Sequence, residues 1–194
     1  MNGKIKLLIT IVLVAIFFGA ALFLYNSLSK EYAPEVFNEP VNTGESEESG
    51  DESEGHTIAA PDFTVLNEKG DEVKLSDYFG KPIVLNFWAT WCGYCVEEMP
   101  DFERAYKEHP EVQFLMVNAT DGVRETTEKA KQFLEEKGFT FPVVYDTQQS
   151  AVYAYYVTGF PSTYFIDAEG SMVTYFNGML SYENLIKGIG FITE

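Results

Sequence analysis

The sequence contains few residues that bind metals, with two cysteines and two histidines among 194 residues. A structural zinc site needs about four such ligands, and neither His56 nor His109 has zinc-finger spacing from the cysteines. Cys92 and Cys95 stand three positions apart, so a purely structural disulfide between them closes a very small loop and adds little stability. We therefore expect no metal and no cofactor, and the pair favours redox chemistry over either structural role.

Basic residues are also scarce. The chain has 13 Lys and Arg against 30 Asp and Glu, which gives a formal net charge of −17. Nucleic acid is recognised through basic surfaces that neutralise its phosphates. The composition therefore argues against nucleic acid as a partner.

The acidic charge is concentrated between residues 31 and 55, where nine acidic side chains occur without any Lys or Arg. Such a segment cannot bury enough apolar surface to offset the entropy lost on ordering. We expect residues 30–56 to be a disordered linker that extends by self-repulsion. An acidic tail that binds a metal or a partner is the alternative.

Residues 7–29 contain no charged side chain and consist mainly of Leu, Ile, Val, Phe and Ala. This stretch of 23 residues is long enough to cross a bilayer as a helix. Lys4 and Lys6 precede it and acidic residues follow it, so residues 1–6 are expected in the cytoplasm. A cleaved signal peptide is the alternative, although its apolar core is usually shorter. We expect a single-pass anchor in the cell membrane and an extracytoplasmic domain, where disulfides persist.

Residues 57–194 carry the strand and helix signals of a folded domain. Strands are expected at residues 62–66, 71–75, 83–88, 112–118, 143–145, 163–167 and 172–176. Helical segments are expected at 76–80, from 92 to about 108, and at 124–137, 150–156 and 181–190. This order predicts an α/β fold with a mixed central sheet, helices on both faces and an N-terminal β-hairpin.

The two cysteines lie between the apolar strand at 83–88 and the helix that follows. The first turn of a helix has unpaired N–H groups and partial positive charge, which favours a thiolate at Cys92. That thiolate can attack a disulfide in another protein, and Cys95 can then resolve the mixed disulfide. The pattern indicates a thiol–disulfide oxidoreductase.

Five short motifs extend this pattern. They are the run from Asn86 to Cys95, Glu98-Met99-Pro100, the run from Gly159 to Asp167, Pro61-Asp62-Phe63 and Leu75-Ser76-Asp77. Together they resemble the thioredoxin superfamily, and more closely its TlpA-like and ResA-like membrane-anchored oxidoreductases. The resemblance covers residues 57–194 and implies a thioredoxin-like fold. It also implies a kink at Pro100 in the active-site helix.

The resemblance implies roles for further residues. Phe160–Pro161 should be a cis peptide bond beside the cysteines, exposing backbone groups to a substrate strand; a simple strand-entry proline is the alternative. Thioredoxin has a buried aspartate where this chain has Asn86, and ResA-like proteins instead carry a glutamate at the position of Glu98. A partly buried Glu98, one helical turn beyond Cys95, would take the proton of the resolving thiol. An exposed helix glutamate is the alternative.

We expect Trp91, Gly93 and Tyr94 to contact the substrate, although Tyr94 could merely cover Cys95. The residues between the cysteines tune the redox potential, but Gly-Tyr does not give the direction of electron flow. The resemblance suggests protein disulfides as substrates, apocytochrome c among them, and an integral-membrane electron carrier as the donor.

Other functions compete with a reductase. The same site could run as a disulfide oxidase or isomerase. A peroxiredoxin-like peroxidase would need a Pro-x-x-x-Thr-x-x-Cys loop, and the segment from Asn86 to Cys92 lacks that proline. A copper-delivery module would space its cysteines one residue wider and use a distant downstream histidine, whereas His109 lies close in sequence.

Overall fold

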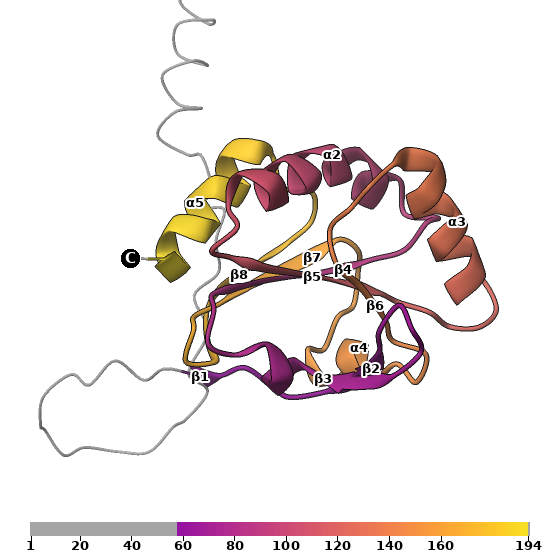
Figure 1. Cartoon of the computed structure of the whole chain (residues 1–194), viewed down its shortest axis with the longest axis horizontal. Coiled ribbons are helices and arrows are strands. Elements are labelled where there is room, and N and C mark those ends of the chain that lie inside the picture. The colour runs from indigo at the N-terminus through magenta and orange to yellow at the C-terminus, as the bar shows by residue number, and fades with distance from the viewer. Residues whose placement is uncertain (1–57, 194) are drawn as a thin grey trace, which may run out of the picture. The chain divides into compact units, whose positions relative to one another are not determined.

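The computed structural model describes residues 58–193, in which helices cover both faces of a mixed sheet (Figure 1). The strands are β1 (Ile58–Ala59), β2 (Thr64–Leu66), β3 (Glu72–Lys74), β4 (Ile83–Trp88), β5 (Gln113–Asn118), β6 (Val143–Tyr145), β7 (Ser162–Ile166) and β8 (Ser171–Asn177). The helices are the short 3₁₀ helix η1 (Leu75–Tyr78), α2 (Gly93–Glu108), α3 (Thr127–Lys137), α4 (Ser150–Ala154) and α5 (Tyr182–Thr193).

Strand β4 lies inside the sheet, whose order is β1-β8-β7-β4-β5-β6-β2-β3. It pairs in parallel with β5 and antiparallel with β7, and all six of its residues are buried. A strand buried on both faces reads as a continuous apolar run, as the sequence predicted here. The predicted N-terminal hairpin is also confirmed, because β2 pairs antiparallel with β3.

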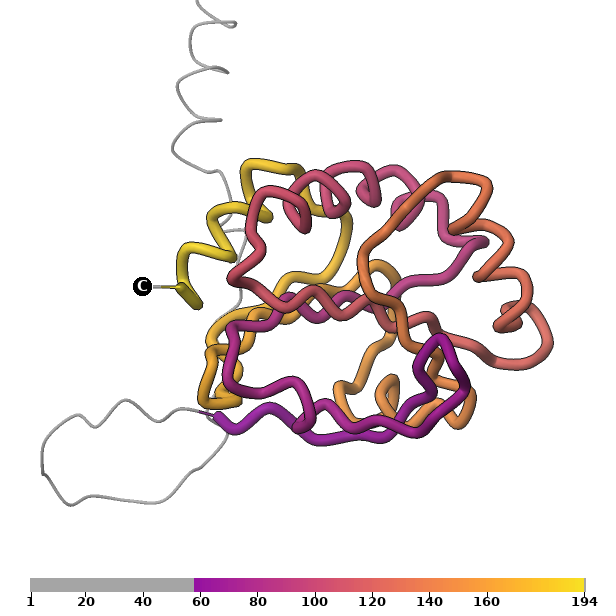
Figure 2. Tube along the Cα trace, in the orientation of Figure 1, coloured from indigo at the N-terminus to yellow at the C-terminus, as the bar shows by residue number. Residues whose placement is uncertain are grey.

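The residues of β4 alternate between two separate cores. Val84 and Trp88 pack on the side covered by α2, α3 and α5, and Leu85 and Phe87 pack on the side covered by η1 and α4 (Figures 1 and 2). This alternation follows from the two-residue period of a strand. It places Asn86 on the same side as Val84 and Trp88, facing the helix that carries the cysteines.

Helix α5 packs very closely on β7. At Gly188 an added Cβ would lie 2.2 Å from the Cζ atom of Phe165. Real Cβ contacts are never this short, so only glycine fits at this position while the ring and the helix keep their places. The close packing fixes the height of α5 above the sheet.

Some sequence-based boundaries are wrong. Helix α3 begins at Thr127 rather than at residue 124, α4 ends at Ala154, and α5 continues to Thr193. Helix α2 ends at Glu108, as predicted. It continues through Pro100, and the predicted kink there stays a prediction.

Three predicted segments lie outside the described residues: the cytoplasmic N-terminus (1–6), the membrane anchor (7–29) and the acidic linker (30–56). Within residues 58–193, no helix combines the length and apolarity needed to cross a membrane.

Candidate active site

Cys92 and Cys95 form a disulfide at the start of helix α2. Cys92 is the N-cap residue, and its sulfur accepts a hydrogen bond from the Cys95 N–H at 3.1 Å. The side chain that caps a helix faces its unpaired N–H groups, which stabilise negative charge. Cys92 is therefore the position at which a thiolate is favoured.

The two cysteines differ in access to solvent. Cys92 is 6% exposed and Cys95 is fully buried. Both cysteines are therefore largely buried in this oxidised form, and the small exposed part of the pair belongs to Cys92.

Glu98 is buried beneath this turn, with 1% of its surface exposed, so the alternative of an exposed helix glutamate is wrong. Its Oε1 accepts a hydrogen bond from Asn86 Nδ2 at 2.9 Å, and its Oε2 accepts one from the Leu180 N–H at 2.8 Å. The second hydrogen of Asn86 Nδ2 is donated to Thr163 Oγ1 at 3.0 Å. Glu98 thus joins helix α2 to strand β4 and to the segment before α5, and Asn86 extends the network to β7.

Burial raises the pKa of the Glu98 carboxyl to about 8, because the hydrogen bonds from Leu180 and Asn86 offset only part of the cost of desolvating the charge. No cation forms a salt bridge with this carboxyl among the described residues. A carboxyl whose pKa lies near neutral pH can both accept and donate a proton.

The Phe160–Pro161 peptide bond is cis, as the resemblance implied. The Phe160 ring packs edge-on against Trp91 with 5.7 Å between ring centroids, so the cis-proline loop lies beside the active-site turn. Pro161 precedes β7, which pairs with β4.

Three of the five expected substrate contacts lie at the surface, whereas Phe160 is half-buried and Pro161 is buried. Trp91 is 40% exposed and Tyr94 is 66% exposed, so Tyr94 does not simply cover Cys95. Gly93 is also exposed, and a Cβ added there would meet no atom within 4 Å. These three residues leave an accessible apolar surface around Cys92.

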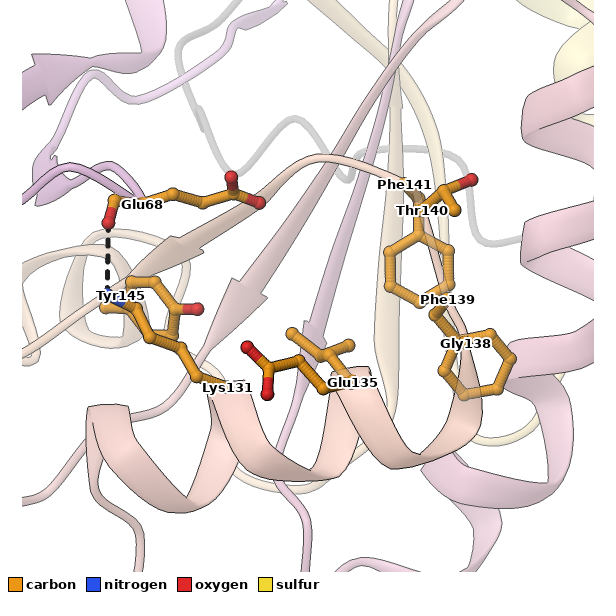
Figure 3. A pocket seen from close by; sticks show the side chains of 9 residues that line it. Glu68, Lys131, Glu135, Gly138, Phe139, Thr140, Phe141 and Tyr145 are labelled. Atoms are coloured by element: carbon orange, nitrogen blue, oxygen red, sulfur yellow. Dashed lines mark hydrogen bonds between the residues drawn. The ribbon is translucent and has the colours of Figure 1, made fainter.

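A pocket of about 430 Å³ lies away from these residues, between α3, β6 and the turn after β2 (Figure 3). Lys131 reaches across it and donates a hydrogen bond to the Glu68 carbonyl at 3.0 Å. None of the predicted site residues lines this pocket. Within the described part of the chain, no cluster of His, Cys, Asp and Glu could hold a metal ion.

Comparisons with known proteins agree with this geometry. The AhpC/TSA family matches residues 57–175. ResA, a thiol-disulfide oxidoreductase of Geobacillus kaustophilus, is 39% identical over 128 residues, which cover 65% of this chain and 71% of the relative. ResA of Bacillus subtilis is 35% identical over 147 residues, covering 72% and 80%. The chain belongs to the ResA-like thiol-disulfide oxidoreductases of the AhpC/TSA family.

Solved structures support the thioredoxin-like fold of this ResA-like chain. A thiol:disulfide interchange protein DsbE from Chlorobium tepidum has a TM-score of 0.62 and 30% identity, covering 69% of this chain and 94% of its own. The exposed lipoprotein thioredoxin Etrx1 from Streptococcus pneumoniae has a TM-score of 0.60 and 28% identity, covering 66% and 98%. The ResA-like chain is accordingly a thiol–disulfide oxidoreductase of thioredoxin-like fold.

The sequence analysis missed a second buried glutamate at this site. Glu125 is fully buried, and it accepts hydrogen bonds from the Thr90 N–H at 3.0 Å and the Thr90 hydroxyl at 2.6 Å. A third donor is Asn118 Nδ2, at 2.7 Å. Glu125 therefore fixes the turn that leads into Cys92. One feature of the sequence could have pointed to Glu125: Asn118 is a polar residue at the end of a buried strand beside β4, and it needs a buried hydrogen-bond partner.

Proposed function

We propose that this protein is a membrane-tethered, extracytoplasmic reductase of protein disulfides. The observation that carries the proposal is the cysteine pair at the start of α2, in which Cys92 is the N-cap residue and 6% exposed and Cys95 is fully buried. The uncharged stretch 7–29, the preceding lysines and the acidic segment after it support tethering with the domain outside.

The reaction begins with the reduced pair. The Cys92 thiolate attacks one sulfur of a substrate disulfide, which forms a mixed disulfide and releases the other substrate sulfur as a thiolate. Cys95 then loses its proton and attacks the Cys92 sulfur, so the bond to the substrate breaks. The substrate leaves with both sulfurs reduced, and the protein keeps the Cys92–Cys95 disulfide found in the structure.

Glu98 is proposed to take the proton of Cys95 in the second step. It lies three positions beyond Cys95 on the same helix, and both side chains are buried in the same region under α2. Its pKa of about 8 leaves a carboxylate fraction at neutral pH that can act as a base. When the disulfide is reduced again, the same group returns the proton.

The proposed substrate class is apocytochrome c, whose Cys-x-x-Cys-His site must be reduced before haem attachment. An integral-membrane electron carrier is the proposed donor, because each turnover consumes two electrons that an extracytoplasmic protein must receive from elsewhere. Both proposals rest on the resemblance to membrane-anchored ResA-like proteins.

A disulfide oxidase or isomerase with the same cysteines is the competing function. Equilibration of the full-length protein with defined thiol buffers separates the two. A reductase should have a potential below about −220 mV, near that of thioredoxin, whereas a value above about −150 mV would support the oxidase. The DsbE and ResA names of the relatives favour disulfide exchange over a peroxidase or a copper carrier.

Substrate and location need a second experiment in the native host. Cys95→Ala should trap mixed disulfides through Cys92, and these should be found in the membrane fraction and be accessible to protease from outside. Apocytochrome c among the trapped proteins would support the substrate proposal. If Cys92→Ala were the variant that trapped partners, the roles of the two cysteines would be reversed.

A further inference from the structure

Arg124 lies against the active-site turn. Its guanidinium carbon lies 3.7 Å from the centroid of the Trp91 ring. Trp91 is the residue directly before Cys92. Phe160 packs on Trp91 as well, with its ring centroid at 5.7 Å. Three segments that are distant in the sequence thus meet at one exposed indole.

The backbone that carries Arg124 is held by a compact turn. Asp121 Oδ1 accepts hydrogen bonds from the N–H groups of Val123, Arg124 and Glu125 at 2.8, 2.7 and 2.9 Å. Gly122 has a φ of +74° and donates its N–H to the Glu125 carbonyl at 2.9 Å. A side chain that starts from such a backbone loses less freedom when it binds a partner.

The same turn is attached to the loop that presents Cys92. The buried Glu125 carboxylate accepts both the N–H and the hydroxyl of Thr90, two residues before the cysteine. Arg124 and Cys92 are therefore positioned by one hydrogen-bonded unit.

Two basic side chains lie at this corner of a chain whose formal net charge is −17. Arg124 forms no salt bridge with any residue in the described range 58–193. Lys129 brings a second cation, because its Nζ donates to the Arg124 carbonyl at 3.1 Å. Two acidic side chains belong to the same turn, and both are held by other donors: Asp121 Oδ1 accepts three N–H groups, and the buried Glu125 is bound by Thr90 and Asn118.

We propose that Arg124 is a specificity residue that binds a carboxylate next to the reactive cysteine of the partner protein. A guanidinium pairs with a carboxylate through two parallel hydrogen bonds, and stacking on an aromatic face leaves its N–H edge free to do so. Trp91 and Phe160 supply the adjoining apolar contact. The inference rests on the proposed role of Cys92 as the nucleophile that meets the substrate.

The test uses reduced full-length protein in detergent and three disulfide-linked peptide dimers. The peptides carry Glu, Gln or Lys on both sides of the cysteine and are otherwise identical. Each second-order rate is divided by the rate at which dithiothreitol reduces the same peptide, which removes the effect of flanking charge on the thiols themselves. The wild type should prefer the Glu peptide over the Lys peptide by about fivefold to tenfold, less at high salt.

Arg124→Gln should remove this preference and Arg124→Glu should reverse it. Lys131→Gln is the matched control, because it removes a cation from helix α3 at a site away from Cys92, and it should keep the wild-type ratio. If Arg124→Gln kept the wild-type ratio of Glu-peptide to Lys-peptide rates, the proposed role of Arg124 would be overturned, while the proposed reductase function would stand. If the wild type failed to reduce even the Gln peptide, the proposed reductase would be rejected as well.

Discussion

Two glutamates on helix α2 are both largely buried, yet their pKa values move in opposite directions. Glu98 is 1% exposed and Glu103 is 9% exposed. Burial raises the pKa of Glu98 to about 8. At Glu103 burial acts in the same direction, but hydrogen bonds from Lys107 and Thr140 outweigh it, so the pKa is lowered.

The difference lies in the number and charge of the donors. Glu98 receives two neutral N–H donors, from Asn86 and Leu180. Glu103 receives the N–H and hydroxyl of Thr140, the N–H of Phe141 and the ammonium of Lys107. A carboxylate with a full set of donors is a structural anchor, whereas one with too few donors remains able to exchange a proton. One helix thus carries both kinds of carboxylate, five positions apart.

The largest expected effect is the dependence of stability on pH that Glu98 causes. Because its pKa is raised from 4.5 to about 8 on folding, the folded state binds the proton more tightly, and stability is lost as pH rises through this range. The free energy of unfolding of the oxidised protein should fall by about 3–5 kcal/mol between these pH values. Glu98→Gln should lack this component, and the difference between the two curves from urea titrations measures it. Parallel curves would contradict the raised pKa.

Glu103 should show the opposite behaviour. Glu103→Ala leaves the N–H groups of Thr140 and Phe141 without their acceptor and should cost about 2–3 kcal/mol at pH 7. Because the pKa of Glu103 is lowered on folding, this contribution should be present above pH 4.5 and shrink as pH falls below it. Glu97→Ala, at an exposed position of the same helix, is the control. A loss below about 0.5 kcal/mol would mean that Glu103 is not an anchor.

Glu98 should also be the one of the two glutamates that matters in catalysis. Glu98→Gln should slow resolution of the mixed disulfide by about tenfold or more and remove the inflection near pH 8, because an amide cannot titrate. The fold can tolerate the amide, since Asn86 Oδ1 has no partner among the described residues and can accept its N–H after the Asn86 amide rotates. Single-turnover pH–rate profiles decide the matter. Identical profiles for wild type and variant would leave the resolving thiol to water or another group.

A smaller effect is expected from Asn86→Asp, which replaces a donor to Glu98 by a second carboxyl group. The two carboxyl groups would stand about as close as Asn86 Nδ2 and Glu98 Oε1, which are 2.9 Å apart. Like charges this close cannot both ionise easily, so the last ionisation of the pair should move above 8, by about one pH unit. Titration of the variant by ¹³C NMR of the carboxyl carbons tests this, and a downward shift would contradict it.

The smallest effect should follow removal of residues 1–55. Within the described residues 58–193, the hydrogen bonds to Glu98 and Glu103 come from residues beyond the removed segment, so the pKa values and the rate of insulin reduction should stay within experimental error. Loss of exchange activity in the purified truncated protein would reject the assignment of these residues to tethering.

Much of this arrangement was predictable from short sequence patterns. The buried strand β4, the helix after Cys92 and the left-handed Gly138 that ends α3 are all local features, and the sequence contains their signals. Glu98 was also found, but only through the resemblance to ResA-like proteins, because helix spacing alone also fits a surface glutamate.

The partners that give Glu98 its properties were not predictable. Thr163 lies 77 residues from Asn86, and Leu180 lies 82 residues from Glu98, so no local pattern connects them. The predicted start of α3 was wrong for another reason. Residues 121–125 form a separate turn around the Asp121 side chain, and Thr126 caps the helix by accepting the Lys129 N–H. Both Asp121 and Thr126 can cap a helix, so residue type alone does not show at which of them the helix begins.

Gly188 also restricts how this domain can diverge in sequence. Any side chain at this position would push the ring of Phe165 or lift helix α5 from β7. Moving α5 away from the sheet would also displace the short segment before it, in which the Leu180 N–H donates a hydrogen bond to Glu98. A methyl group at position 188 would then change the proton affinity at the active site. Substitutions at Gly188 are therefore not expected to be neutral, although this residue contacts neither cysteine.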